Sequence, residues 1–118
     1  MSSQPSDPVV ACNITAIPKE FRQVHQAHTE RVFASAQEVR ELSTGYAWRL
    51  PNETDLLQTV VAFLSYERLC CPFFRFTLEI EPDQGSVWLK ITGAIDVREF
   101  LRSEGLVPAA KGSPSESV

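Results

Sequence analysis

Apolar residues near the start of the chain recur at spacings of three and four, which is the period of one helix face. Thr15 supplies a capping side chain and Pro18 suits a first helical turn, so we predict a helix over about 17–35. The face expected to contact the core consists of Ile17, Phe21, Val24, His28 and Val32. His25 falls outside this face and is expected to point to solvent.

The middle of the chain predicts a hairpin and a second helix. Two extended runs on either side of Ser43-Thr44-Gly45 predict a β-hairpin over 39–50, in which the glycine supplies the positive φ of a tight turn. A second helical period follows over about 54–70, and Pro72 ends it because proline disfavours helical backbone in the residue before it. The predicted inner face of this helix comprises Leu57, Val60, Val61, Leu64, Arg68 and Cys71, broadened by Leu56 and Phe63.

From Phe74 onward the period changes to two, which predicts strands. Phe74, Phe76, Leu78 and Ile80 alternate with polar residues, and a returning strand with Val87, Leu89 and Ile91 follows a turn at 82–85. A short helix over about 95–104 ends at Gly105. The order α-β-β-α-β-β-α predicts an α+β fold: a two-layer sandwich in which helices cover one face of an antiparallel four-stranded sheet.

The composition is that of one folded domain. A chain of 118 residues with 43% hydrophobic residues can bury a core without disulfide cross-links. Segments 1–8 and 107–118 are rich in polar and small residues, so we expect a single domain over 9–106 between two flexible tails.

Charge and hydropathy narrow the choice of partner. The net charge of −4 and the scattered arginines argue against nucleic acid or an anionic membrane, because both select for clustered Lys and Arg. The chain begins without a basic, apolar leader, and no apolar run approaches the ~18 residues of a membrane span. Three cysteines are an odd count, which suits a reducing compartment where thiols stay free or bind metal. We therefore expect a cytoplasmic protein.

The adjacent Cys70 and Cys71, between the second helix and the strand, are the main candidates for chemistry. Buried cysteine often does no more than fill space, because it packs as a small hydrophobe. Glu67 precedes the pair by three and four residues and so shares their helix face. A carboxylate beside two thiols is unusual for packing alone, which keeps a chemical role open.

The position of this pair favours some chemistries over others. The negative end of the helix dipole and Glu67 should both raise the thiol pKa values, which disfavours a reactive nucleophile even if Arg68 offsets part of the effect. Adjacent cysteines form a strained disulfide, which disfavours a redox pair. A cation reverses the electrostatic argument, because it deprotonates coordinating thiols and is attracted by the carboxylate. Soft ions such as Zn²⁺, Cu⁺ and Hg²⁺ suit thiolates best.

Metal binding requires further ligands, and the chain offers Cys12 before the first helix and His25 and His28 on it. A hydrogen-bonded core histidine is a commoner role for His28 than a ligand, and Cys12 is equally suited to be buried filler. If Cys12 packs against the end of the second helix, three thiols meet. The distance between Cys12 and Cys71 therefore decides between a metal site and inert packing.

The chain resembles a group of small uncharacterised bacterial proteins. The resemblance rests on Glu67-Arg68-x-Cys70-Cys71-Pro72-Phe73, on Phe76-x-Leu78, on Gly85-x-Val87-Trp88-Leu89-x-Ile91-Thr92-Gly93 and on Phe100-Leu101. An early cysteine such as Cys12 and a segment such as Gly45 to Pro51 also belong to the pattern, which covers about residues 11–104. His25 and His28 do not. Such proteins are associated with genes for heavy-metal response, so the resemblance implies a thiol site for a metal.

The favoured hypothesis is a small cytoplasmic protein that binds a soft metal ion, with zinc as the first choice, or a small thiol-reactive ligand. The candidate ligands are Cys70, Cys71, Cys12 and Glu67, with His28, His25 and Arg68 as secondary candidates. The alternative is a structural or interaction module with buried free cysteines, whose partner is another protein or a second copy of the chain in a homodimer. A thiol-dependent enzyme comes third, because it needs a basic group beside Cys70 or Cys71 and an open cleft.

Overall fold

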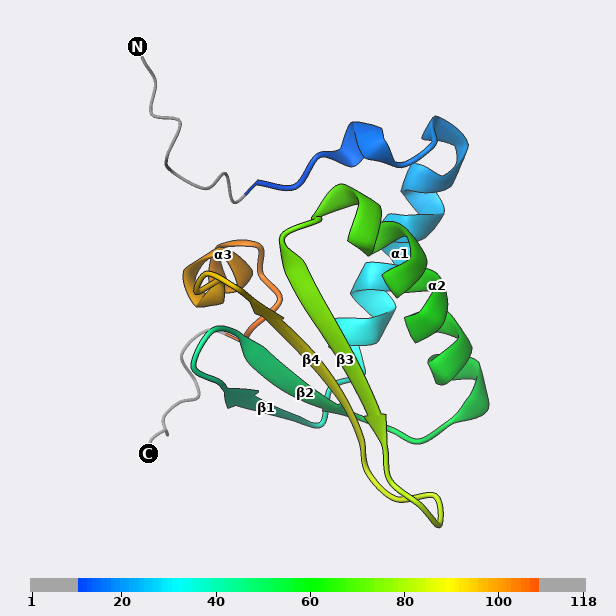
Figure 1. Cartoon of the computed structure of the whole chain (residues 1–118). Helices are drawn as coiled ribbons and strands as arrows, with labels where there is room; N and C mark the ends of the chain where they lie inside the picture. The colour runs from blue at the N-terminus through cyan, green and yellow to red at the C-terminus, as the bar shows by residue number, and fades with distance from the viewer. Residues whose placement is uncertain (1–10, 109–118) are drawn as a thin grey trace.

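The computed structural model describes residues 11–108 and has the predicted α+β fold (Figure 1). Its elements are two 3₁₀ turns, Ile14–Ala16 and Lys19–Phe21, the helices α1 (Arg22–Ala34), α2 (Thr54–Cys70) and α3 (Arg98–Ser103), and the strands β1 (Glu38–Glu41), β2 (Tyr46–Leu50), β3 (Phe74–Ile80) and β4 (Val87–Gly93). The order of helices and strands along the chain is the predicted one, and α2 ends one residue before Cys71 as Pro72 requires.

The four strands form one antiparallel sheet in the order β1-β2-β4-β3. Strand β4 is the last along the chain but lies between β2 and β3 in the sheet. Its residue Leu89 is paired with Trp48 of β2 on one side and with Leu78 of β3 on the other. These residues and their alternate neighbours lie on the inner face of the sheet. The register therefore places the period-two apolar residues of three strands on one side.

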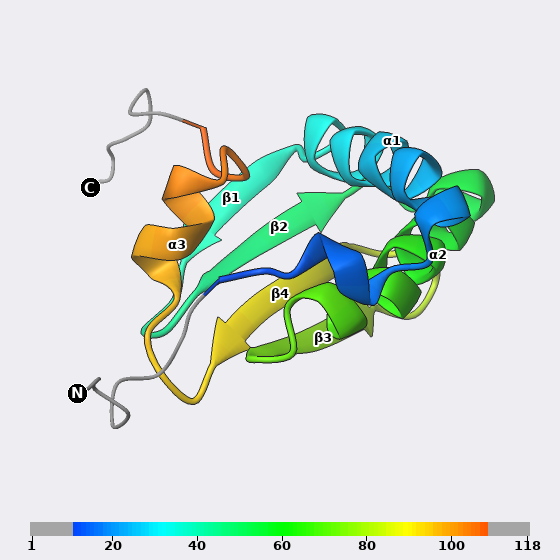
Figure 2. The ribbon, with the colours of Figure 1, turned by 90° about the horizontal axis from the view of Figure 1, so that it is seen from above.

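Helices and the N-terminal segment cover that inner face. Figure 2 shows α1 and α2 packed side by side at one end of the sheet and α3 at the other, with the segment that leads into α1 crossing between them. Trp48 and Phe63 are the largest side chains that are completely buried, and Trp48 donates a hydrogen bond from Nε1 to the carbonyl of Leu106 at 2.9 Å. The core thus lies between α2, the sheet and the segment that follows α3.

Gly45 lies just before β2, and its role there differs from the predicted one. Its φ is not positive; among residues 11–108 the glycine with positive φ is Gly105, at 78°, just past the end of α3. A Cβ on Gly45 would instead overlap the carbonyl oxygen of Ile91 in β4. The glycine therefore permits close approach of two strand backbones.

The first helix differs from its prediction in start and in face. The segment Lys19–Phe21 is a 3₁₀ turn, and the α-helix begins only at Arg22. Phe21 and Val24, assigned to the core from the sequence, are 40% and 42% exposed, whereas His25, assigned to solvent, is only 4% exposed. The helix is rotated because the His25 ring, unlike Val24, has a buried hydrogen-bonding partner on α2, and Phe21 stacks on Tyr66 of α2 at 5.4 Å between ring centroids.

The predicted flexible tails lie outside the described residues, apart from Val107 and Pro108 at the start of the second. Val107 packs against the core although it lies one residue beyond the predicted domain limit of 106. Within residues 11–108, no helix combines the length and the apolar character needed to cross a bilayer.

Candidate thiol site

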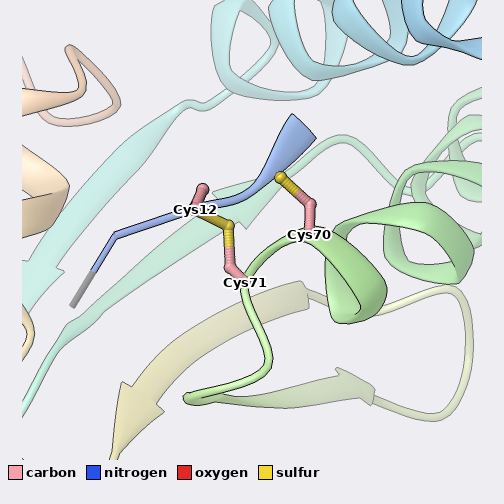
Figure 3. A group of neighbouring side chains, drawn as sticks. All are labelled: Cys12, Cys70 and Cys71. Carbon is pink, nitrogen blue, oxygen red and sulfur yellow. A yellow bond between two sulfur atoms is a disulfide. The ribbon is translucent and has the colours of Figure 1, made fainter. Parts of the chain in front are cut away.

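The three cysteines come together at the C-terminal end of α2 (Figure 3). Cys70 is the last residue of the helix, Cys71 is its cap, and Cys12 comes from the segment that crosses the sheet. Their three Sγ atoms all lie within 4.8 Å of one another. Cys12 and Cys71, 59 residues apart in sequence, form a disulfide, and Cys70 is a buried free thiol beside it.

Backbone hydrogen bonds position Cys12 at the helix end. The N–H of Asn13 donates to the carbonyl of Cys70 at 2.8 Å, and the N–H of Cys71 donates to the carbonyl of Glu67 at 2.8 Å. Asn13 also caps the following 3₁₀ turn, because its Oδ1 accepts from the N–H of Thr15 at 3.1 Å. The N-terminal segment thus satisfies a terminal carbonyl of α2 and brings Cys12 to the adjacent cysteines.

A buried acid and a buried histidine lie next to the disulfide. Nε2 of His25 is 2.8 Å from Oε1 of Glu67, and the other carboxylate oxygen, Oε2, is 3.4 Å from Sγ of Cys71. Nδ1 of His25 is buried without a hydrogen-bonding partner among the described residues, so its contact with Glu67 is the hydrogen bond that the ring makes. A hydrogen bond from sulfur to Oε2 requires the Cys71 thiol, so it forms only when the disulfide is reduced.

The surroundings of Cys70 disfavour its thiolate. Burial raises the pKa of the Cys70 thiol most, and the negative charges of Glu67 and Glu104 raise it further. The N–H of Asn13 lowers this pKa in part. The expectation that Glu67 raises the thiol pKa is therefore confirmed for Cys70, although burial, which the sequence did not reveal, is the larger cause.

The three cysteines line an open groove of about 1170 Å³. Residues of α1, including His25 and Thr29, also line it, as do the aromatic residues Phe74 and Phe100. Glu67 also lines the groove. The site is therefore open to small molecules, although Cys70 and Cys71 themselves are buried and Cys12 is half-buried.

The structure brings together most of the residues predicted for the site. Cys12, Cys70 and Cys71 meet as the metal hypothesis requires, and Glu67 contacts Cys71. Arg68 is exposed and His28 lies one turn beyond His25, and neither lines the groove. The cluster of mutually close donor atoms among residues 11–108 consists of the three sulfurs, without Glu67 or a histidine.

Two sequence-based expectations about this site are wrong. The cysteines were expected to stay free or to bind metal, but Cys12 and Cys71 are joined in a disulfide, with their Cα atoms 4.5 Å apart. His25 was expected in solvent, but it is buried against Glu67. The sequence does contain a signal for the burial of His25. Glu67 lies on the same helix face as three apolar residues, Leu56, Val60 and Phe63, and a charge on such a face needs a buried partner.

Comparisons with known proteins leave the site to be interpreted from its own chemistry. No family model, no curated protein and no solved structure matches the chain.

Proposed function

We propose that the reduced protein binds one soft, thiophilic metal ion through the thiolates of Cys12, Cys70 and Cys71. The observation that carries the proposal is the meeting of all three sulfurs within 4.8 Å, from two segments far apart in sequence. Thiolate ligands favour Zn²⁺, Cu⁺ and related soft ions over hard ions such as Mg²⁺.

The geometry requires small changes for such a site. Zinc–sulfur bonds of about 2.3 Å place tetrahedral ligand sulfurs about 3.8 Å apart, which is within the present spread of the three sulfurs. The sulfurs of Cys12 and Cys71 must first be reduced and then separate to that distance. A cation also removes the cost that burial and Glu67 impose on the Cys70 thiolate, because its positive charge favours the deprotonated form.

Metal titration of the reduced protein tests this proposal. Full-length protein is reduced with a phosphine, which does not compete as a thiol ligand, and titrated anaerobically with Zn²⁺ or Hg²⁺. We expect one ion per chain, and Cys70→Ser should weaken binding by at least about a hundredfold, because loss of a direct ligand exceeds the effect of losing an outer contact. Oxidised protein should bind no metal at this site.

Arg68→Ala is the matched control, because Arg68 lies on the same turn of α2 but is exposed and outside the groove. It should bind as the wild type does. The proposal is wrong if reduced wild type and Cys70→Ser bind the same amount of metal with the same affinity.

A second candidate function is thiol–disulfide exchange with small thiols, and the Cys12–Cys71 disulfide favours it. Cys12 is the less buried of the two bonded sulfurs and lines the groove. An external thiolate would attack Sγ of Cys12, break the bond and release Cys71 as a thiolate. A second external thiolate would then attack the external sulfur of the mixed disulfide, which yields the free external disulfide and Cys12 thiolate, and both protein thiolates take protons from water.

Equilibration with reduced and oxidised glutathione distinguishes exchange from a structural cross-link. An exchanging disulfide should be half-reduced at a potential above about −300 mV, within the range that glutathione buffers reach. Alkylation of the quenched mixture followed by mass spectrometry measures the reduced fraction. A bond that stays intact in excess reduced glutathione is structural, and that result excludes the exchange function.

A further inference from the structure

Strand β3 has one unpaired edge. It is the outer strand of the order β1-β2-β4-β3, and Figure 2 shows no other strand of residues 11–108 on its free side. Its seven residues, Phe74–Ile80, contain no proline or glycine and no bulge in their pairing with β4. Outer strands are usually protected by such features, so a regular edge of this length is ready to pair with another strand.

Apolar side chains flank this edge. Ile80 at the end of β3 is 53% exposed and Val61 on α2 is 58% exposed. Thr59 accepts a hydrogen bond from Arg31 of α1, so Thr59 is on the side of α2 that faces α1. Val61 is two residues further along, which is about 200° around the helix axis, and therefore lies on the side away from α1. The half-buried residues on the same flank and on the inner face of β3 are Leu57, Leu64, Phe76 and Leu78. The open side of the sandwich is therefore apolar beside a free strand.

The sequence of β3 is complementary to itself in an antiparallel arrangement. If two copies of β3 meet with a two-fold axis at Thr77, Arg75 of each copy lies opposite Glu79 of the other. Phe76 then lies opposite Leu78 on the inner face, and Phe74 opposite Ile80. The pairing puts opposite charges together on the outer face and apolar side chains together on the inner face, and both kinds of pair stabilise a sheet.

The two charged residues are available for such a contact. Arg75 is exposed, with no carboxylate of residues 11–108 within ion-pairing distance. Glu79 is 3.1 Å from Lys90, and its side chain remains 43% exposed. In a dimer, Arg75 of one copy would therefore pair with the Glu79 carboxylate of the other, which Lys90 already orients.

We propose that this chain forms a homodimer through antiparallel pairing of β3, centred on Thr77, so that two four-stranded sheets become one continuous sheet. The exposed Ile80 is then covered by Phe74 of the second copy. This inference does not depend on the metal and exchange functions, because the charged pair at its centre, Arg75 and Glu79, is not among the residues that line the thiol groove.

Charge reversal at the two-fold pair tests the dimer. Wild type, Arg75→Glu and Glu79→Arg are each examined by light scattering coupled to size exclusion and by sedimentation across a range of concentrations. We expect a dimer for the wild type. Each single variant places like charges opposite each other twice, so its dimer dissociation constant should rise at least about tenfold.

Complementation separates loss of pairing from loss of folding. An equimolar mixture of Arg75→Glu and Glu79→Arg restores both opposite-charge contacts and should give a heterodimer with a dissociation constant near that of the wild type. The double variant Arg75→Glu/Glu79→Arg should likewise recover its homodimer. A monomeric wild type, or single variants that dimerise as the wild type does, overturns the proposal, as does a mixture that stays monomeric.

Discussion

Cys12→Ser is expected to lower the free energy of unfolding of the oxidised protein by about 4 kcal/mol. The disulfide closes a loop of 59 residues, and the chain-entropy relation gives a value of this size for such a loop in the unfolded state. For a chain of this length the loss corresponds to roughly 15 °C in Tm. Chemical and thermal unfolding of oxidised wild type and Cys12→Ser measure the difference.

Reduction provides the internal comparison for this experiment. Wild type unfolded in the presence of a reductant should approach the stability of Cys12→Ser, because both lack the cross-link. Cys70→Ser keeps the bond between Cys12 and Cys71, so its oxidised form should remain well above Cys12→Ser. Equal stabilities for oxidised wild type and Cys12→Ser would show that the cross-link does not constrain the unfolded chain.

His25→Ala is expected to cost about 3–5 kcal/mol, because it leaves the buried Glu67 carboxylate without its partner. Glu67 is only 8% exposed, so water cannot replace the lost hydrogen bond without rearrangement. The His25 ring also stacks on Phe63 with 5.6 Å between ring centroids, and its removal adds a packing loss. Denaturant unfolding measures the change.

A double-mutant cycle assigns this cost to the pair. His25→Leu/Glu67→Leu removes both polar groups and should be far less destabilising than either replacement alone. His28→Ala is the control on the same helix, because Nδ1 of His28 has no hydrogen-bonding partner among residues 11–108 and its loss strands no charge. If His25→Ala and His28→Ala cost the same, the contact between His25 and Glu67 does not stabilise the fold.

The sequence was sufficient for the elements whose signals are local. The switch from helical period to alternation around Pro72 predicted the end of α2 and the start of β3, because proline acts on its own neighbours. The strand order was not predictable, since β4 pairs not only with β3, its neighbour along the chain, but also with β2, which precedes α2. The face of α1 was misassigned because the partner of His25 is on another helix, 42 residues away.

The residues of the candidate site were named from the sequence, but the disulfide between two of its cysteines was not predicted. Local spacing identified Cys70, Cys71 and Glu67, and the count of cysteines suggested Cys12. Which cysteine meets which depends on the path of the N-terminal segment across the sheet, and its backbone bond to Cys70 has no signature in the sequence. For that reason the pairing of Cys12 with Cys71 could not be inferred.

The strand order also bears on how the chain behaves while the ribosome makes it. Strand β4 lies between β2 and β3 but is synthesised after both. Synthesis proceeds from the N-terminus at roughly 5–20 residues per second, so β2 and β3 emerge before the strand that joins them. A nascent chain that stops short of residue 87 has the inner edge of β2 and both edges of β3 unpaired. Unpaired strand edges are where growing chains aggregate. When β4 inserts, it pairs with the inner edge of β2 and with one edge of β3, and of these three edges only the outer edge of β3 stays unpaired.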